Sequence, residues 1–600
     1  MKSTFSLTDP YVEYSRRLEA RRAEAARLSC LDRNIGNARL MTVLIGAGIG
    51  WFAIKPGLLA VWWLALPGIV FVGLVFSHER VRRASRLVQR SVAFYERGIA
   101  RLEDRWSGQG EPGTDFLASE HPYAQDLDLF GQGSLFELLC AARTHGGEYT
   151  LAGWLRTPAS LEEIRARQEA VEELRSKLDL RELLALRGED MRVGVHPEQL
   201  VTWAEEPASR ELERERATAA ALVSLTVATL VGWAGFALNP LFFLAVLGVE
   251  GIFAFRLRTR VLHIIASVTP ANRDLRLLAE VLACFEAEHF TCPRLVALRT
   301  ALDTKGAPPS QQIERLGRLI NLLESRNNQL FIPIAALLLW TTQIALAIEA
   351  WRRMSGPAIA RWLTAIGELE ALCSLAGYAY EHPVDPFPEI VGEGPWFKGE
   401  GLGHPLIPDT RCVRNDVHLG GPVRILIVSG SNMSGKSTLL RTVGINAVLA
   451  MAGAPVRARR LRISPLALGA TVRIQDSLQT GSSHFYAEIT RLRVLMDLAH
   501  GPRPLLFLLD EIFHGTNSHD RQIGAEAIIR SFLKRGAIGL VTTHDLALTR
   551  VAESLAPQAA NVCFEDHLEN GQLVFDYHMR PGVVRKSNAL ALMRAVGLEV

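Results

Sequence analysis

The feature that most constrains this chain is a short apolar stretch that ends in a glycine-rich loop. Residues 425–438 read ILIVSGSNMSGKST, and Gly430, Gly435, Lys436 and Ser437 fit the spacing G-x-x-x-x-G-K-[ST] of a phosphate-binding P-loop. Glycines at these positions let backbone N–H groups approach a phosphate, and the helix that follows directs its positive end at the same anion. A glycine-rich turn that binds no nucleotide is the alternative. The apolar strand before the loop and the helical pattern after it favour the P-loop.

Other apolar strands of the C-terminal region also end in polar residues. Residues 505–509 are a continuous apolar run followed by Asp510 and Glu511. Downstream of a P-loop, this order predicts that Asp510 holds Mg²⁺ through water and that Glu511 polarises the attacking water. Residues 540–543 are predicted to be a further buried strand that ends at His544, which we expect to contact the γ-phosphate or sense its loss. A histidine that is only a hydrogen-bonded structural residue is the alternative.

The C-terminal region as a whole, residues 396–600, alternates strands with helices. This alternation predicts a parallel sheet covered by helices on both faces. Gly481, Ser482 and Ser483 precede a helical stretch, HFYAEITRLRVLMDLA, whose N-terminus is a second anion site where a serine hydroxyl would reach a phosphate. A plain N-cap is the competing explanation.

Length, charge and cysteine content set only broad limits. A chain of 600 residues is long enough for three or four domains. Its net charge of +3 neither demands nor excludes an acidic partner such as DNA, because binding depends on a local patch. The seven cysteines are scattered without a C-x-x-C spacing, which indicates a reduced, cytosolic setting.

Apolar segments arranged in pairs indicate a membrane. Residues 41–76 form one hairpin and residues 217–255 a second, each with a short turn that contains proline. Arginines flank the outer ends of both hairpins, so the positive-inside rule places all four ends in the cytoplasm. The prediction is a protein of the cytoplasmic membrane whose ATPase domain faces the cytoplasm. Buried helices of a soluble core are the alternative, which Glu250 supports, and re-entrant hairpins are as compatible with the lengths as full crossings.

The rest of the chain is predicted to be helical. Residues 1–40 read as a basic helix, 77–125 as a helical connector, and 126–216 with 256–395 as a helical core. The third apolar block, residues 330–348, is predicted to be a buried helix, because one more crossing would place the P-loop outside the cell. Ser160 with Glu163 predicts a capping box, and the proline- and glycine-rich stretch 383–403 predicts a linker.

Longer motifs around the predicted site resemble one family, the MutS mismatch-repair proteins. The matching segments are GSNMSGKST at residues 430–438 (family G-P-N-M-x-G-K-S-T), SHFYAEI at 483–489 (S-T-F-M-x-E-M), DEIFHGTNSHD at 510–520 (D-E-x-x-R-G-T-S-x-x-D) and Thr543 with His544 (T-H). Residues 146–158 and 167–174 also resemble the start of the MutS helical core. The resemblance is close over the C-terminal third, looser over 130–395 and absent over 1–125.

The resemblance implies an ABC-type P-loop ATPase domain that binds ATP and Mg²⁺ and works as a homodimer with composite sites. Each site would take its P-loop from one subunit and Ser483 from the other. The catalytic residues would be Lys436, Glu511 and His544, and the residues that hold Mg²⁺ would be Ser437 and Asp510. The implied nucleotide-binding residues are Gly430, Ser431, Asn432, Met433, Ser434, Gly435, Lys436, Ser437, Thr438 and Ser483. This chain departs from the family pattern at Ser431 (proline in the family), His484 (threonine), His514 (arginine) and Asn517 (serine).

DNA is a candidate partner through the family, although the sequence lacks the family's mismatch-reading domain. The triplet Phe94-Tyr95-Glu96 resembles its Phe-x-Glu wedge but lies in a helical, arginine-rich stretch. The arginines between 457 and 462 would meet phosphates or form a solvated surface, and the solvated surface is favoured.

The leading hypothesis is a membrane-tethered, ATP-hydrolysing MutS-like dimer that acts on DNA in mismatch repair or recombination. The alternative is a membrane-associated ATP-driven switch that acts on protein or lipid partners without DNA. An ABC transporter is disfavoured, because the chain has neither enough spans nor an L-S-G-G-Q signature.

Overall fold

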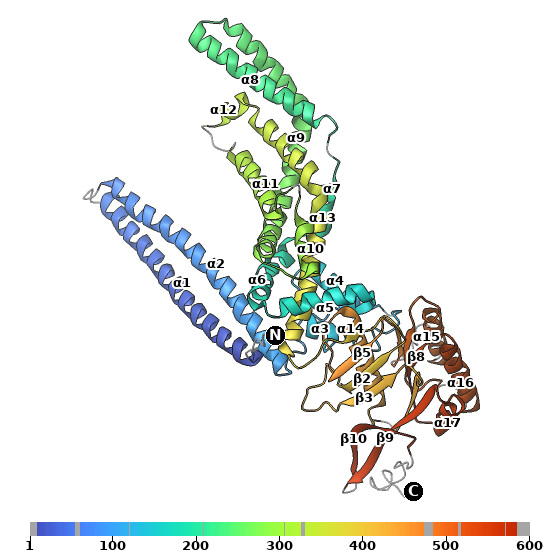
Figure 1. Cartoon of the computed structure of the whole chain (residues 1–600). Helices are drawn as coiled ribbons and strands as arrows, with labels where there is room; N and C mark the ends of the chain where they lie inside the picture. The colour runs from blue at the N-terminus through green and yellow to red at the C-terminus, as the bar shows by residue number, and fades with distance from the viewer. Residues whose placement is uncertain are drawn as a thin grey trace.

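The computed structural model describes residues 9–54, 60–118, 120–207, 209–304, 306–325, 331–431, 433–472, 484–513, 518–569 and 572–584. Within these residues, Figure 1 shows a central helical body, two long helical arms that diverge from it, and an α/β domain on the side away from the arm tips. The prediction of a mostly helical N-terminal part and a mixed α/β C-terminal part is confirmed.

The first arm is an antiparallel pair of long helices. It consists of α1 (Pro10–Ile54) and α2 (Ala65–Leu102), with the 3-10 turn η1 (Val61–Leu64) near the tip. The basic helix predicted over 1–40 and the first apolar segment are therefore one continuous helix. The connector predicted over 77–125 is helical only as far as the end of α2, and beyond it the chain is irregular apart from a short 3-10 turn, η2 (Thr114–Phe116).

Aromatic packing and a buried ion pair hold the base of the first arm to the helical body. Tyr14 packs against Tyr95 and Tyr380, and its hydroxyl donates a hydrogen bond to Glu381 (3.1 Å). Arg101 donates to both oxygens of the same carboxylate (2.7 and 2.6 Å). Because Glu381 is buried, this bidentate pair fixes the direction in which the arm leaves the body.

The second arm is formed by α8 (Leu212–Phe236) and the first half of α9 (Pro240–Ala287). The turn between them follows from its sequence: the side chain of Asn239 accepts a hydrogen bond from the N–H of Leu241 (2.9 Å), and Pro240 occupies the first helical turn. The second half of α9 continues into the helical body, where its apolar residues are buried. The arm is thus a rigid extension of the body.

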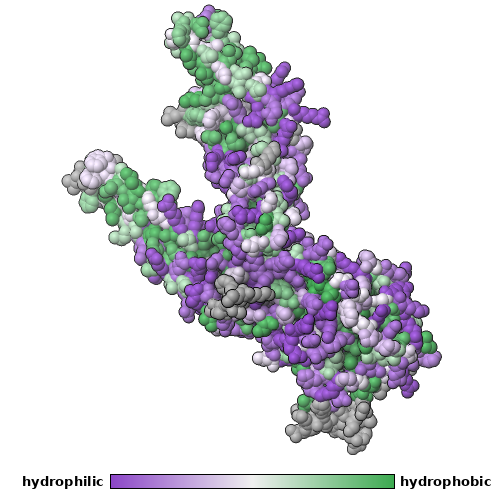
Figure 2. Space-filling model, viewed as in Figure 1, coloured by the Kyte–Doolittle hydropathy of each residue, from purple (hydrophilic) through white to green (hydrophobic). Residues whose placement is uncertain are grey.

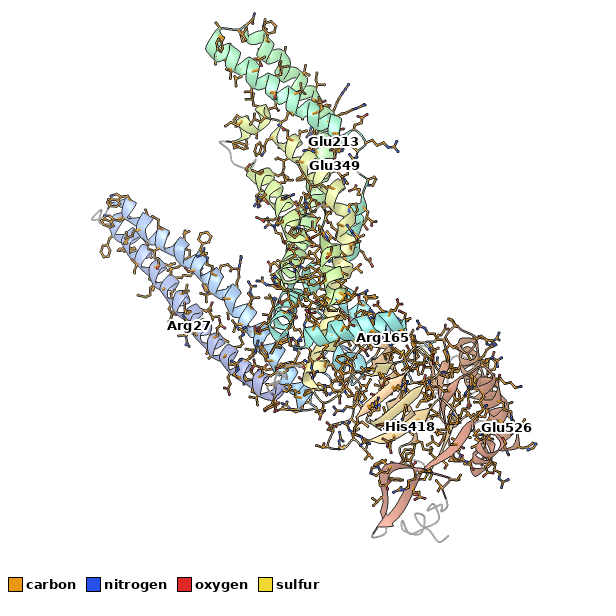
Figure 3. The ribbon with its side chains drawn as sticks, in the orientation of Figure 1. Arg27, Arg165, Glu213, Glu349, His418 and Glu526 are labelled. Carbon is orange, nitrogen blue, oxygen red and sulfur yellow. The ribbon has the colours of Figure 1, made fainter. Side chains whose placement is uncertain are left out.

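Charged residues fix the base of the second arm. Arg260 of α9 binds Glu215 (2.7 Å) and also contacts the carboxylate of Glu349, which is buried. Figure 3 shows Glu349 on the body directly below Glu213 at the start of the arm. The arginine therefore joins both helices of the arm to the body at one point.

Four helices among the described residues are long and apolar enough to cross a membrane, and they are the helices of the two arms: α1, α2, α8 and α9. Between 0% and 17% of the residues in their most apolar windows are buried. Figure 2 shows hydrophobic surface gathered toward both arm tips, whereas the α/β domain is mostly hydrophilic. The alternative of apolar helices buried in a soluble core does not describe this arrangement.

The third apolar block is not one buried helix. It is divided into α12 (Ile332–Leu337) and the start of α13 (Trp340–Glu381) by Leu339, whose φ of 45° breaks the helix. Ile332 is 52% exposed, whereas Ile348 is 1% exposed. The prediction of a buried helix is therefore wrong for the first part of the block and confirmed for the second.

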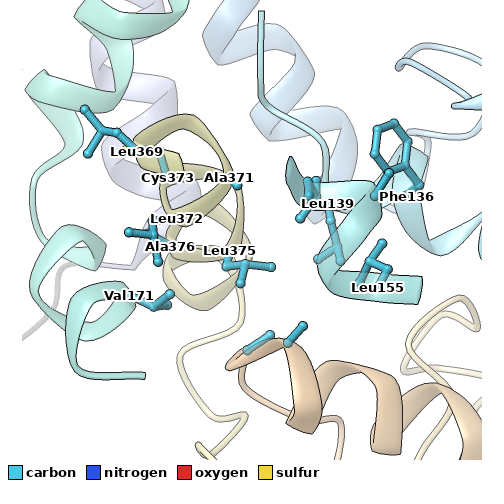
Figure 4. Packing of buried hydrophobic residues seen from close by; sticks show 14 of the residues in the cluster. Phe136, Leu139, Leu155, Val171, Leu369, Ala371, Leu372, Cys373, Leu375 and Ala376 are labelled. Atoms are coloured by element: carbon cyan, nitrogen blue, oxygen red, sulfur yellow. The ribbon is translucent and has the colours of Figure 1, made fainter. Parts of the chain in front are cut away.

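The helical body is organised around α13, which packs along most of its neighbours. Figure 4 shows its Leu369, Leu372 and Leu375 between Val171 of α5 and the residues of α3 and α4. At the start of α5 the predicted N-cap is present, since the hydroxyl of Ser160 accepts from the N–H of Glu163 (3.2 Å). The Glu163 side chain instead accepts a hydrogen bond from Arg167 (3.1 Å), so among the described residues only the serine half of the predicted capping box forms. The remaining helices of the body are α3 (Leu135–Leu139), α4 (His145–Arg156), α5 (Leu161–Arg175), α6 (Leu178–Gly194), α7 (Pro197–Glu205), α10 (Pro293–Leu302) and α11 (Pro309–Glu324).

The main sheet of the α/β domain has, within the described residues, the strand order β10-β9-β4-β8-β7-β6, and β10 alone is antiparallel to its neighbour. Alternate residues of its central strands enter two separate hydrophobic cores, one shared with α14 and the helical body and the other with the remaining helices. Both faces are therefore covered, as the continuous apolar strands predict. The elements are β4 (Ile425–Ser429), α14 (Lys436–Ala452), β6 (Ala467–Thr471), α15 (His484–Leu498), β7 (Leu505–Leu509), α16 (Ser518–Lys534), β8 (Ile538–Thr543), α17 (Leu546–Ser554), β9 (Ala559–Glu569) and β10 (Gln572–Pro581).

A smaller sheet lies beside the first and corrects a prediction. Its order among the described strands is β1-β5-β2-β3, formed by β1 (Glu389–Ile390), β2 (Phe397–Leu402), β3 (Asn415–Leu419) and β5 (Arg460–Ile463). The stretch 383–403, predicted as a linker, supplies β1 and β2 of this sheet. Its prolines lie outside the strands, Gly399 and Gly401 lie within β2, and Phe397 is fully buried.

The α/β domain and the helical body share a continuous core. Gly444 of α14 lies so close to Leu127 that an added Cβ would meet the leucine side chain at 2.6 Å. Beside this contact the carboxylate of Asp126 accepts hydrogen bonds from the N–H of Val472 (2.7 Å) and from Arg491 (2.8 Å). α14 and the segment around residues 126 and 127 are therefore closely packed on each other.

Candidate nucleotide site

The glycine-rich loop lies between the buried strand β4 and the helix α14, as predicted. Gly435, at the N-cap of α14, has a φ of 101°, which a residue with a Cβ rarely adopts. At Gly430 an added Cβ would lie 2.6 Å from Oγ of Ser434. The backbone conformation therefore requires glycine at position 435, whereas at position 430 a Cβ would crowd the Ser434 hydroxyl.

Lys436 directs its ammonium group into this loop. Its Nζ donates to the carbonyl oxygens of Gly430 (3.0 Å) and Ser431 (2.9 Å), and the residue is 5% exposed. The same Nζ lies 3.4 Å from Oε1 of Glu511, at the end of the neighbouring part of the sheet. The lysine thus links the loop with the carboxylates that follow β7.

The carboxylates after β7 are held by a residue that the sequence analysis missed. The hydroxyl of Thr542, in β8, donates to Oδ1 of Asp510 and accepts from the N–H of Glu511 (3.0 Å). Thr542 is fully buried. Its only signal in the sequence is a threonine near the end of a mostly apolar strand, which is common in sheets and does not indicate a partner.

His544 follows β8 and joins the same cluster. Its Nδ1 lies 3.4 Å from Oε2 of Glu511. Strand register explains the meeting: β4 and β8 are parallel neighbours with Ser429 opposite Thr543, so the loop after β4 and His544 leave the same edge of the sheet. The three strand ends converge on Glu511, which contacts both Lys436 and His544.

Lys436 and Glu511 line a pocket of about 1450 Å³, and His544 contacts Glu511 from outside this lining. Lys436, Ser437 and Thr438 line it from the loop, and Asp510 and Glu511 from the end of β7. The hydroxyl groups of Ser431 and Ser434, inside the loop, are buried and have no hydrogen-bond partner among the residues that the structure describes. Unsatisfied donors in a glycine-rich loop fit a phosphate, which accepts hydrogen bonds from several directions.

The far wall of the pocket comes from β10, which the sequence analysis did not connect with the site. Tyr577 has a φ of 55° at an irregularity in the pairing of β9 with β10, and its ring lies against Gly435. The amide of Asn415 in β3 fixes this bulge, donating to the carbonyl oxygen of Tyr577 (3.0 Å) and accepting from the N–H of Met579 (2.7 Å). A half-exposed aromatic ring in this place offers a face on which a base can stack.

Comparison with known proteins supports the motif assignment. The family model of MutS domain V matches residues 426–599. Endonuclease MutS2 of Thermus thermophilus is 34% identical over 203 residues, which cover 32% of this chain and 25% of the relative. DNA mismatch repair protein MutS of Natronomonas pharaonis is 32% identical over 239 residues (39% and 27%), and that of Geobacillus kaustophilus is 31% identical over 267 residues (43% and 29%). The C-terminal region belongs to the MutS family.

The likeness to MutS is confined to part of each protein. The chain matches between a quarter and a third of the length of these curated relatives. The MutS model begins within β4 and takes in the P-loop, the carboxylates after β7 and His544. The two arms lie N-terminal to the residues that this model matches.

Of the MutS-type site residues, Asn432 and Ser483 lie outside the described residues, as do His514 and Asn517. Met433 is 84% exposed with a φ of 67°, and Ser434 is buried. Ser437 and Asp510 both line the pocket, and among the described residues no group of three or more histidine, cysteine or acidic side chains is arranged to bind a metal. A hydroxyl and a carboxylate suit Mg²⁺, which retains several waters and binds substrate phosphates.

The MutS features associated with DNA are placed differently. Tyr95, the centre of the triplet that resembles the Phe-x-Glu wedge, is buried at the base of the first arm, so the triplet is not a wedge. Arg457 is also buried and pairs with Asp385 (3.2 Å), which contradicts a solvated role for this arginine. The other arginines of that group are about half or more exposed, and each pairs with a carboxylate: Arg459 with Asp416, and Arg460 and Arg462 with Glu389.

Proposed function

We propose that this protein is a membrane-tethered ATPase of the MutS type, in which the nucleotide state of the α/β domain acts on the two helical arms. The observation that supports it is the contact of Glu511 with both Lys436 and His544 at the end of three neighbouring parallel strands. Such a cluster supplies a cation for the phosphates, a carboxylate for the attacking water and a histidine near the γ-phosphate.

Each residue of the site would have a separate role in ATP binding or hydrolysis. Backbone N–H groups of residues 430–435 and the N-terminus of α14 would hold the β-phosphate, with Lys436 bridging to the γ-phosphate. Ser437 and Asp510 would hold Mg²⁺, which neutralises charge on the phosphates when bound. Glu511 would orient and polarise the attacking water, and Tyr577 would stack on the base.

We further propose a homodimer with composite ATP sites. In such a dimer Ser483 of one subunit would complete the pocket of the other, as the MutS resemblance implies. Support comes from the exposure of Met433, which lines the pocket, and of the His544 side chain (41%), which contacts Glu511; a second copy would cover both. Light scattering of Glu511→Gln protein with and without Mg-ATP tests this: a dimer that needs ATP supports the proposal, and an ATP-independent monomer opposes it.

Membrane attachment is proposed through residues 41–76 and 217–255. The exposed apolar surface of the arm tips is costly in water, and arginines flank it on the side of the body. Insertion of both tips would leave the ATPase domain in the cytoplasm, away from the bilayer. Alkaline carbonate extraction of cell membranes measures this attachment directly, and release of the protein into the supernatant would contradict it.

DNA is the proposed ligand by relationship to MutS. The second candidate, a switch that acts on protein or lipid partners without DNA, is favoured by the pairing of the arginines near residue 460 with carboxylates and by the apolar ends of both arms. A gel-shift titration with duplex, branched and mismatched DNA at two salt concentrations separates the candidates. Salt-dependent binding supports the first, and its absence supports the second.

The ATPase activity has a simpler test with a matched control. Lys436→Ala removes the buried ammonium of the loop and is expected to abolish ATP binding. Lys398→Ala changes an exposed lysine of β2 and is expected to leave it unchanged. If the Lys436 variant hydrolyses ATP at the wild-type rate, the proposed site is wrong.

A further inference from the structure

A second cavity lies where the first arm joins the helical body, away from the nucleotide pocket. It has a volume of about 180 Å³ and is bounded by the last turns of α2, the loop after α2 and the junction between α3 and α4. Arginines line it from three directions: Arg97 and Arg101 from α2, Arg143 from the α3–α4 junction and Arg192 from α6.

Two of these arginines are neutralised by carboxylates. Arg101 forms the bidentate pair with Glu381 described above. Arg192 binds Glu111 (2.5 Å) and Glu148 (3.1 Å). Glu137 also lines the cavity, but its oxygens already accept hydrogen bonds from the N–H groups of three glycines in the adjoining loops.

The other two arginines have too little negative charge around them. Arg97 forms no ion pair with any residue that the structure describes, and its Nε donates to the carbonyl oxygen of Ala93 (3.2 Å). Nε of Arg143 lies 3.6 Å from Glu189 and is buried without a hydrogen bond. Burial and the neighbouring charge of Arg143 lower the pKa of Arg97 to about 10, and burial also lowers the pKa of Arg143. Two partly buried cations that repel each other are unfavourable unless an anion lies between them.

We propose that this cavity binds a small phosphoryl anion between Arg97 and Arg143. Planar guanidinium groups are suited to phosphate oxygens, with which they form two hydrogen bonds at once. The volume fits inorganic phosphate or a small phosphate monoester and is below the range of pockets that hold larger ligands. A bound phosphoryl group would join α2 to the start of α4 and so stiffen the base of the first arm.

The source of the phosphoryl group follows from distance along the arm. From the end of the apolar segment at Phe76 to Arg97, α2 extends about 30 Å at 1.5 Å per residue. Lipid headgroups at the end of that segment would not reach the cavity. The ligand is therefore a soluble anion.

The test is thermal unfolding of the full-length protein in detergent micelles, with inorganic phosphate or with chloride at equal ionic strength. Phosphate is expected to raise the Tm of the wild type by several degrees, and to do the same for Lys436→Ala, which lacks the cation of the nucleotide loop. Arg97→Gln and Arg143→Gln are expected to lose the shift. Arg97→Lys should keep part of it, and Arg105→Gln, a change at an exposed arginine of the adjoining loop, should keep all of it.

Several outcomes would overturn the proposal. They are the absence of a phosphate shift in the wild type, a full shift in Arg97→Gln, or loss of the shift in Lys436→Ala alone, which would assign phosphate to the nucleotide site. The Tm of each variant in chloride shows whether it is folded. A final experiment compares vesicles of phosphatidic acid with vesicles of phosphatidylcholine. If phosphatidic acid stabilises the protein in an Arg97-dependent way and free phosphate has no effect, the ligand is a lipid headgroup and not a soluble anion.

Discussion

Thr542 offers the sharpest test of how the candidate site works, because one hydroxyl positions both acidic residues. Replacing it by valine keeps the β-branched shape that suits a buried strand and removes only the hydroxyl. Asp510 then loses a donor and the N–H of Glu511 loses its acceptor, while the substituted side chain itself stays fully buried. The perturbation is therefore confined to the orientation of these two carboxylates.

The expected loss of kcat follows from the energy of these two hydrogen bonds. A hydrogen bond to a charged group contributes about 1.5–3 kcal/mol. If that energy serves to hold Glu511 and Asp510 in the reactive geometry, its loss lowers kcat by about 10- to 150-fold, at about 1.4 kcal/mol per tenfold. Affinity for ATP should change little, because Lys436 and the loop are untouched.

The assay is steady-state phosphate release with Mg-ATP, together with fluorescent-nucleotide binding and a Tm measurement. Thr542→Ser is the matched control, since it keeps the hydroxyl and loses one methyl group, and it should retain most of kcat. A valine variant with kcat within twofold of the wild type would refute the reasoning. A serine variant as slow as the valine variant would refute it equally, because packing and not the hydroxyl would then be responsible.

Three further predictions concern other parts of the molecule. Tyr577→Ala should weaken ATP binding roughly tenfold, as expected from a lost stacking energy of about 1–3 kcal/mol, whereas Tyr577→Phe should bind normally in the same titration. Glu250→Lys places a fixed charge beside Thr226 in the second arm, at a cost of about 2.5–3.5 kcal/mol in a bilayer, so less protein should survive carbonate extraction than with Glu250→Gln. Burial raises the pKa of Glu370 to about 7, so the folded state holds its proton more tightly than the unfolded state. Stability should then fall, by roughly 3 kcal/mol, as the pH rises from about 4.5 to about 7, and Glu370→Gln should flatten this dependence in Tm measurements between pH 5 and pH 8.

The part of the site that could be predicted from sequence is the part set by local backbone chemistry. A glycine-rich loop after an apolar strand has few structural solutions, and acidic residues that end another buried strand fall at the same sheet edge when the strands are parallel. Thr542, Tyr577 and Asn415 were missed because each acts through a contact between segments far apart in sequence. Nothing next to Asn415 in the chain indicates that it fixes a bulge in β10.

The fold shows the same division between local and distant information. Helix type and the N-cap at Ser160 follow from neighbouring residues, and both were predicted. The stretch 383–403 was misread because proline and glycine mark turns without revealing whether the residues between them pair with a distant strand, as β2 does with β5. The prediction for the third apolar block was partly wrong because hydropathy does not reveal backbone conformation, and Leu339, which divides the block, has a left-handed conformation.

The arrangement of the elements gives the nucleotide site a direct route to the arms. α14 begins at Lys436, inside the pocket, and packs with its other face on α4 and α5 of the body. Those helices pack in turn on α13, which also contacts α8 and α9 of the second arm and α2 of the first. Because packed interiors leave little room for independent movement, we expect a shift of α14 to displace the helices on which it packs. A change of nucleotide is therefore expected to reorient both arms, whether their tips lie in a membrane or against another partner.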